Sequence, residues 1–454
     1  MAIETLNPAT GELLKKYDAY GQPKIEKILK SADLAQKSWA RKSIDVRAAA
    51  LAPMANLLRS RVDEYALLMT TEMGKPISQS KAEILKCATC VDHYVDNGAR
   101  YLQEISVPTT AQRSGFRYLP LGVILGVMPW NYPFWQLLRF AIPTLVAGNG
   151  VVLKHASNVP GSALALEQLM LDTGLPDGLF STVLLEGSGV IPLIHDRRIA
   201  GVSLTGSEGV GRRIGSEAGQ ALKPAVLELG GSDPFIVLAD ANIPAAARAA
   251  ATARTLNNGQ SCIAAKRFIV VESAHDEFTS EFVAALSALK VGDPADPSTQ
   301  LGPMARADLR DELHEQVLQT IQTGAEIALG AKVESGPGAF YPATVLTGVT
   351  PGMIGFDEEL FGPAGVVVKA STTNDAIALA NSSRYGLGSS IWTADVEQGL
   401  HLGAQLETGM VFVNDFVRSD PALPFGGVKA SGYGREMGSH GILEFVNTQT
   451  IWVA

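Results

Sequence analysis

Apolar and polar positions follow two different periods along the chain. Near the N-terminus apolar side chains recur at helical spacing, which predicts amphipathic helices over residues 24–40, 46–69 and 76–101. From residue 115 onward, short β-branched runs alternate with helix-length segments, and they predict strands over 115–125, 151–154, 181–185, 202–205 and 225–229. This alternation is typical of a parallel, doubly wound α/β sheet, which binds nucleotides at the carboxyl ends of its strands.

The segment Gly230-Gly-Ser-Asp-Pro234 breaks the pattern and predicts a hinge between two domains. A second α/β series follows, with helices expected over 244–257 and 277–288 and strands over 235–238, 267–271, 364–369, 389–393 and 410–414. The last residues, 448–454, again have a strand pattern, so they need a partner strand in this chain or in a neighbour. A length of 454 residues suits two or three domains.

Composition narrows the function. The chain is 46% hydrophobic and 18% charged, as expected of a soluble enzyme, and its net charge of −9 argues against a nucleic-acid binder. Three cysteines are too few for a disulfide framework, and the N-terminus has no signal-peptide pattern, so we expect a cytoplasmic protein. The apolar stretch 121–148 contains Asn131, Arg139 and three prolines, which argues against a membrane helix.

A glycine-rich turn after one expected strand is the first candidate for a ligand site. In Leu204-Thr-Gly-Ser-Glu-Gly-Val-Gly211, Gly206 and its neighbours allow close approach, and free N–H groups at a helix start favour a phosphate. Lys154 ends another strand and Ser157 follows it, a combination that suits a 2′-phosphate better than a bare ribose. The alternatives are a turn without a ligand and a solvated lysine at a strand end.

Cysteine and glutamate supply the candidate chemistry. Cys262 follows the turn Leu256–Ser261, and Glu228 is the one acid in the apolar run Ala225–Leu229, so the two suggest a nucleophile and its base. The spacing of Cys87 and Cys90 permits a metal or redox pair. Because no second pair or histidine cluster completes a metal site, we interpret them as two half-buried helix cysteines and expect no metal.

Seven sequence motifs occur in order along the chain: Pro129-Trp-Asn-Tyr-Pro133, Leu153-Lys-His-Ala-Ser157, Leu204-Thr-Gly-Ser207, Leu227-Glu-Leu-Gly-Gly231, Asn258-Gly-Gln-Ser-Cys262, Glu358-Glu-Leu-Phe-Gly-Pro363 and Pro424-Phe-Gly-Gly-Val-Lys-Ala-Ser-Gly432. Together they resemble the motifs of the aldehyde dehydrogenase superfamily over nearly the whole chain, and the likeness is greatest to bacterial succinate-semialdehyde dehydrogenases.

The resemblance implies an aldehyde dehydrogenase-like α/β fold with three parts. These are a Rossmann-type, parallel-sheet cofactor domain (1–108 and 126–231), an α/β catalytic domain (232–428) and a small oligomerisation β-arm (109–125 and 429–454). It also implies a homodimer or homotetramer.

The same resemblance implies the catalytic roles. Cys262 would attack the aldehyde carbon, Asn131 and the Cys262 N–H would hold the oxyanion, and Glu228 would be the base for deacylation. The residues implied for the cofactor are Pro129, Trp130, Lys154, Ser157, Gly206, Ser207, Leu229, Glu359 and Phe361. Many NAD-preferring relatives have Glu where this chain has Ser157, so NADP is the implied cofactor, with NAD as the alternative.

For the substrate we expect a short ω-carboxylate aldehyde, succinate semialdehyde first, oxidised to its acid. Arg139 stands two helical turns beyond Asn131 and could pair with the carboxylate, helped by Ser419, with Arg418 as another candidate. Trp135 and Phe425 would form apolar walls.

Two departures from the family pattern are His155, where proline is common, and Ser261, which leaves no cysteine beside Cys262 for a disulfide. Alternative functions are oxidation of another short aldehyde, thiol hydrolysis by Cys262, Glu228 and a lysine such as Lys154, and a non-enzymatic structural role. Acyl transfer to coenzyme A is disfavoured, because Glu228 suits hydrolysis.

Overall fold

The computed structural model describes residues 2–333 and 335–454. It begins with an antiparallel hairpin, β1 (Ala2–Leu6) and β2 (Leu13–Asp18), followed by four helices. These helices are α1 (Gln22–Trp39), α2 (Ile44–Ser60), α3 (Val62–Met73) and α4 (Ile77–Tyr101). The single helix expected over 46–69 was wrong, because the chain leaves helical geometry at Arg61, which ends α2 and starts α3.

A six-stranded sheet forms the first half of the molecule, and it is parallel except for one short edge strand. Its order is β19 (Gly432–Tyr433), β9 (Ala225–Glu228), β8 (Ile199–Thr205), β5 (Val123–Met128), β6 (Gly150–His155) and β7 (Phe180–Thr182). The connecting helices are α5 (Pro133–Val146), α6 (Pro160–Asp172), η1 (Gly187–Val190), α7 (Ile191–His195) and α8 (Glu208–Gln220). The antiparallel strand β19 comes from the C-terminal part of the chain and pairs Gly432 with Glu228.

A seven-stranded sheet forms the second half. Its order is β12 (Glu326–Leu329), β13 (Thr344–Thr347), β14 (Ala364–Ala370), β11 (Ala265–Val271), β10 (Asp233–Val237), β16 (Gly388–Trp392) and β17 (Met410–Val413). The helices in this half are α9 (Ile243–Thr255), η2 (Leu256–Gly259), α10 (Glu272–Ser287), α11 (Ala307–Gln322), α12 (Ile354–Asp357), α13 (Thr373–Asn381) and α14 (Val396–Gly403). Asp233 and Pro234, expected in the hinge, belong to β10. The link between the two sheets, from the end of β9 to the start of β10, is therefore only residues 229–232.

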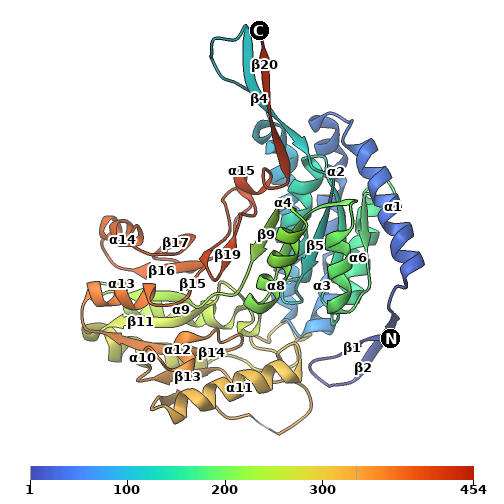
Figure 1. Cartoon of the computed structure of the whole chain (residues 1–454). Helices are drawn as coiled ribbons and strands as arrows, with labels where there is room; N and C mark the ends of the chain where they lie inside the picture. Colours follow the sequence, from blue (N-terminus) through green and yellow to red (C-terminus); the bar gives the residue numbers. More distant parts are fainter. Residues whose placement is uncertain (1, 334) are drawn as a thin grey trace.

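An arm projects from this body and carries the C-terminus (Figure 1). It is a three-stranded antiparallel sheet of β20 (Val446–Val453), β4 (Arg113–Pro120) and β3 (Ile105–Ser106). The last strand thus finds its partner, β4, within the chain. Residues 123–125, which we assigned to the arm, instead start β5 in the six-stranded sheet.

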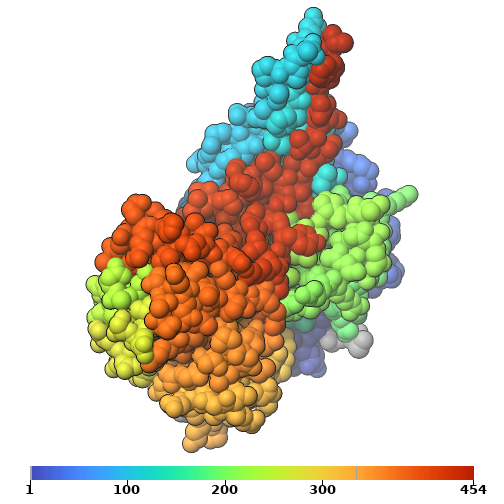
Figure 2. All heavy atoms as spheres, turned by 60° about the vertical axis from the view of Figure 1, so that its left-hand side comes forward, coloured from blue at the N-terminus to red at the C-terminus, as the bar shows by residue number. Residues whose placement is uncertain are grey.

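The C-terminal half lies against the first half below the arm (Figure 2).

Cys87 and Cys90 are completely buried on α4, so the expectation that they are half-buried was wrong. No group of residues arranged to hold a metal ion occurs in the described part of the chain. Among the described helices, none has both the length and the apolar character needed to cross a membrane. The short elements β15 (Tyr385–Gly386), β18 (Val428–Lys429) and α15 (Gly438–Gly441) lead the chain back between the halves.

Candidate active site

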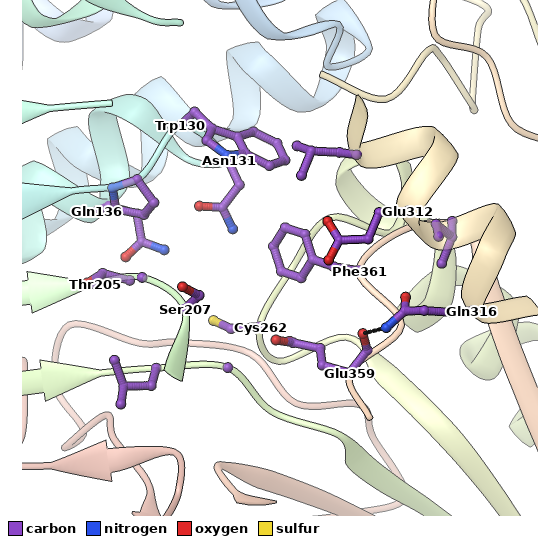
Figure 3. A pocket seen from close by; sticks show the side chains of 16 residues that line it. Trp130, Asn131, Gln136, Thr205, Ser207, Cys262, Glu312, Gln316, Glu359 and Phe361 are labelled. Atoms are coloured by element: carbon purple, nitrogen blue, oxygen red, sulfur yellow. Dashed lines mark hydrogen bonds between the residues drawn. The ribbon is translucent and has the colours of Figure 1, made fainter. Parts of the chain in front are cut away.

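Two cavities meet at the side chain of Cys262, which lines both of them. The first has a volume of about 260 Å³ and opens at the carboxyl ends of strands of the six-stranded sheet. It brings together most of the residues expected to hold the cofactor: Pro129, Trp130, Gly206, Ser207, Leu229, Glu359 and Phe361. Figure 3 shows Asn131, Cys262, Phe361 and Glu359 around this space. Lys154 and Ser157 do not line it.

The glycine-rich turn has the geometry of an anion site. Ser207 is the N-cap of α8, yet its side chain makes no capping hydrogen bond, so the first N–H groups of the helix have no side-chain partner from this residue. Gly211 is required by packing, because a Cβ there would lie 2.4 Å from the Leu229 side chain. The turn can therefore approach a phosphate closely while α8 stays against β9.

Lys154 is the penultimate residue of β6, its side chain is almost buried, and burial lowers the pKa of its ammonium group. No ion pair joins it to a carboxylate among the residues that the structure describes. Ser157 is exposed two residues beyond the strand. An unpaired cation three residues before an exposed hydroxyl suits a phosphate, which supports the expected 2′-phosphate contact.

The departure at His155 has a structural explanation. Its imidazole lies 3.0 Å from the Pro133 carbonyl through Nε2, and its Nδ1 accepts a hydrogen bond of 2.9 Å from the Ala156 N–H. Burial lowers the pKa of His155 to about 4, so the ring is neutral at pH 7. The histidine therefore ties the loop after β6 to the start of α5.

Glu359 is held by a lysine that the sequence analysis missed. Lys266 Nζ lies 3.0 Å from Glu359 Oε1, and it donates hydrogen bonds to the carbonyls of Ser261 and Cys262 at 2.9 and 2.7 Å. The Gly231 N–H donates to the same carboxylate at 3.1 Å, and Gln316 donates to the Glu359 carbonyl (Figure 3). One buried ammonium thus connects the expected ribose-binding acid to the backbone of the nucleophile.

The turn before Cys262 has an unusual backbone. Asn257 and Asn258 both adopt left-handed conformations, with φ of 57° and 56°. Asparagine tolerates this region better than most residues, and here side-chain hydrogen bonds anchor both residues. Asn257 Nδ2 donates to the Asn131 carbonyl at 2.7 Å, and Asn258 Nδ2 donates to the Gly74 and Pro303 carbonyls at 2.8 Å.

Cys262 is partly exposed, whereas the other two cysteines of the chain, Cys87 and Cys90, are fully buried. Burial of its thiol raises the pKa of Cys262 to about 12, although Arg139 and Lys266 act in the opposite direction. The thiol is therefore protonated at neutral pH. Its activation requires a proton acceptor or a positive charge that arrives with a ligand.

Asn131 sits beside the thiol on the loop before α5 (Figure 3). Its Nδ2 donates to the Gln260 carbonyl at 3.1 Å, while its buried Oδ1 has no hydrogen-bond partner in the described part of the chain. An amide nitrogen carries two hydrogens, so one remains available for an oxyanion.

Glu228 is not among the residues that line either cavity. It is almost fully buried at the end of β9, and its carboxylate has no hydrogen-bond partner among the described residues. Burial, and then the nearby Glu436, raise the pKa of Glu228 well above its ordinary value. A Cβ at Gly426 would lie 2.6 Å from its Oε1, so only glycine leaves room for the carboxyl group there.

The second cavity, of about 290 Å³, contains all four residues expected for the substrate: Arg139, Ser419, Trp135 and Phe425. Arg139 stacks on the Phe425 ring at 4.4 Å, but it also forms an ion pair with Glu436, a residue that the sequence analysis missed. Arg418 pairs with Asp415 and is exposed. Lys86, also missed, contacts Ser419 and Trp135. A lone lysine on an amphipathic helix gives no sequence signal that separates it from a surface charge.

The sequence profile of the aldehyde dehydrogenase family matches residues 1–451. The chain belongs to this family. Among similar proteins of the family is a succinate semialdehyde dehydrogenase [NAD(P)+] of Escherichia coli K12, which is 47% identical over 99% of this chain and 97% of its own length.

A probable succinate-semialdehyde dehydrogenase [NADP(+)] of Synechocystis is also 47% identical, over the full length of both chains. The fold is that of solved family members as well. The succinic semialdehyde dehydrogenase of Streptococcus pyogenes, solved with NADP+ as its cofactor, superposes with a TM-score of 0.97 at 37% identity and full coverage of both chains.

Proposed function

We propose that this chain oxidises succinate semialdehyde to succinate with NADP+ as the oxidant, through a thioester on Cys262. The observation that carries the proposal is the position of Cys262, the one cysteine that lies where the two cavities meet. One cavity has the residues of a dinucleotide site, and the other has apolar walls with cationic groups. The names of the similar dehydrogenases support the choice of substrate and cofactor.

The chain's own residues account for each step. The Cys262 thiol gives up its proton to solvent, and its sulfur forms a bond to the aldehyde carbon as the carbonyl π bond breaks. The oxygen that becomes negative accepts hydrogen bonds from Asn131 Nδ2 and the Cys262 N–H. NADP+, held by the residues that line the first cavity, would supply the acceptor for the hydride that leaves this carbon. The remaining thioester reacts with water, which breaks the carbon–sulfur bond and releases the acid and the thiol.

Glu228 is the proposed base for the water. Its raised pKa suits a proton acceptor near neutral pH, because a buried carboxylate gains from taking up a proton. In this structure the carboxyl group points toward Glu436 and Gly426. Its neighbour Leu229 lines the cofactor cavity. We propose that a change of Glu228 rotamer brings the carboxyl group toward the thioester.

The family assignment favours this dehydrogenase over the thiol hydrolase that Cys262, Glu228 and Lys154 left open. We also propose that the arm of β3, β4 and β20 joins subunits into a homodimer or homotetramer, since Trp452 at its end is 58% exposed. The free state of all three cysteines supports a reducing, cytoplasmic location.

A panel of aldehydes tested against NADP+ and NAD+ with the purified protein examines the proposal. We expect the highest kcat/KM for succinate semialdehyde with NADP+, followed at 340 nm, and none with Cys262→Ala. Higher kcat/KM for butanal than for succinate semialdehyde would contradict the substrate, and turnover without reduced cofactor would contradict the reaction.

A further inference from the structure

Three cationic side chains line the substrate cavity, and two of them already have carboxylate partners. Arg139 pairs with Glu436, and Arg418 pairs with Asp415. The third, Lys86 on α4, forms no ion pair among the residues that the structure describes. The cavity therefore holds one cation whose charge is not neutralised by the protein.

The surroundings of Lys86 fix its ammonium group in place. Its Nζ lies 4.4 Å from the centroid of the Trp135 ring and donates a hydrogen bond of 2.6 Å to Ser419 Oγ. Glu83, one turn away on the same helix, is used elsewhere. It pairs with the buried Lys75 and accepts hydrogen bonds from two N–H groups at the start of α5.

A largely buried ammonium without a counter-ion costs free energy, and an anionic ligand beside it recovers that cost. We infer that Lys86, together with the Ser419 hydroxyl, binds the ω-carboxylate of the substrate and so selects carboxylate aldehydes over neutral ones. This inference rests on the proposed function, because it names the residue that gives the same site its substrate preference.

The hydrogen-bond inventory fits a two-oxygen ligand. One N–H of the ammonium donates to Ser419, which leaves two for the ligand. Because Ser419 Oγ accepts from Lys86, its own O–H is free to donate to the second carboxylate oxygen. The Trp135 ring holds the ammonium by a cation–π contact that a carboxylate does not disturb.

Lys86 also gives the site a pH dependence. Burial, and then the charge of Arg139, lower the pKa of Lys86 to about 8, against opposing contributions from Cys87, Glu83 and Asp420. These groups face it from α4, α5 and the loop after β17, and Cys262 and Arg418 share its cavity. A bound carboxylate favours the protonated lysine, so affinity for carboxylate aldehydes should fall as the pH rises above 8.

Three variants test the inference: Lys86→Met, Lys86→Arg and, as a control on the same helix, Lys81→Met. Lys81 pairs with Asp63 at the surface and does not line the cavity. We measure the ratio of kcat/KM for succinate semialdehyde to that for butanal. Lys86→Met should lower the ratio by about tenfold or more, since a charged hydrogen bond is lost. Lys86→Arg should keep most of it, and Lys81→Met all of it.

The second measurement is the KM for both aldehydes between about pH 7 and pH 9.5, which spans the titration of a lysine with a lowered pKa. In the unsubstituted enzyme the KM for succinate semialdehyde should rise with pH, whereas the KM for butanal should not. In Lys86→Arg the KM for succinate semialdehyde should also stay constant with pH, because arginine stays charged. Effects of Cys262 titration act on both aldehydes and cancel.

An unchanged substrate ratio in a folded Lys86→Met protein would overturn the inference, as would the same pH difference in Lys86→Arg. If Lys86→Met does not fold, the pH profile of Lys86→Arg decides. Preference of the unsubstituted enzyme for butanal would instead contradict the proposed function.

Discussion

The guanidinium of Arg139 on α5 forms an ion pair with the carboxylate of Glu436, and their side chains are only 2% and 4% exposed. The pair joins two segments almost 300 residues apart in the sequence. It also places a positive charge beside Glu228, whose carboxyl group lies in the same buried cluster. Arg139 therefore has a structural partner in addition to the substrate role that the sequence suggested.

Arg139→Met should destabilise the protein because it leaves Glu436 buried without its partner. Removing one member of a buried ion pair costs on the order of 3–5 kcal/mol. Urea unfolding measures this cost, and the double variant Arg139→Met with Glu436→Gln should recover part of it. If the single variant lost no stability, the pair would have no structural role. A loss of activity in Arg139→Met alone is thus no clean measure of substrate recognition.

Glu228→Gln should separate the two halves of the reaction. Hydride transfer comes before the thioester reacts with water, so it does not need Glu228 as a base. A burst of NADPH close to one per active site should therefore remain. Steady-state kcat should then fall by about 100-fold or more, because deacylation loses its base. Stopped-flow absorbance at 340 nm measures both phases.

The matching control for this experiment is Cys262→Ala, which should show neither burst nor turnover. A Glu228→Gln enzyme with normal steady-state kcat and no burst would contradict the assignment of Glu228 as the deacylation base.

Alkylation of Cys262 should be slow in the enzyme without cofactor. With a pKa raised to about 12, the reactive thiolate is a minor form below that pH, and its fraction grows tenfold per pH unit. The rate of iodoacetamide labelling should therefore keep rising up to at least about pH 10. Mass spectrometry should find the label on Cys262 alone, since Cys87 and Cys90 are buried. A plateau near neutral pH would show that the free thiol is already activated.

Ser157→Glu should reverse the cofactor preference. A carboxylate at this position would repel the 2′-phosphate and offer the ribose hydroxyls of NAD+ a partner. We expect kcat/KM with NADP+ to fall by about tenfold or more and kcat/KM with NAD+ to rise. Ser157→Ala serves as the control for loss of the hydroxyl alone, and an unchanged preference in both variants would remove Ser157 from the cofactor site.

The sequence predicted the central strands such as β6 and β11, because their β-branched runs are buried on both faces. It did not predict the exposed hairpin strand β2 or the edge strand β12, whose residues are mostly exposed or half-buried. It predicted the residues around Cys262 through family motifs. It did not predict Lys266, although a lysine inside an apolar strand was a usable signal. The pairing of Arg139 with Glu436 depends on the tertiary fold, and no local pattern encodes it. Arg61 also has no strong helix-breaking character, so the division between α2 and α3 could not be read from spacing.

The left-handed turn at Asn257 and Asn258 has a consequence for how this enzyme loses activity. Its side chains are tied to the loops at Gly74 and Pro303 and to the start of α5, all outside the nucleophile's own segment. The position of the Cys262 sulfur thus depends on contacts between the two halves of the molecule. A low concentration of denaturant that loosens the junction between the halves should abolish activity while both sheets remain folded. Loss of activity should therefore precede loss of secondary structure.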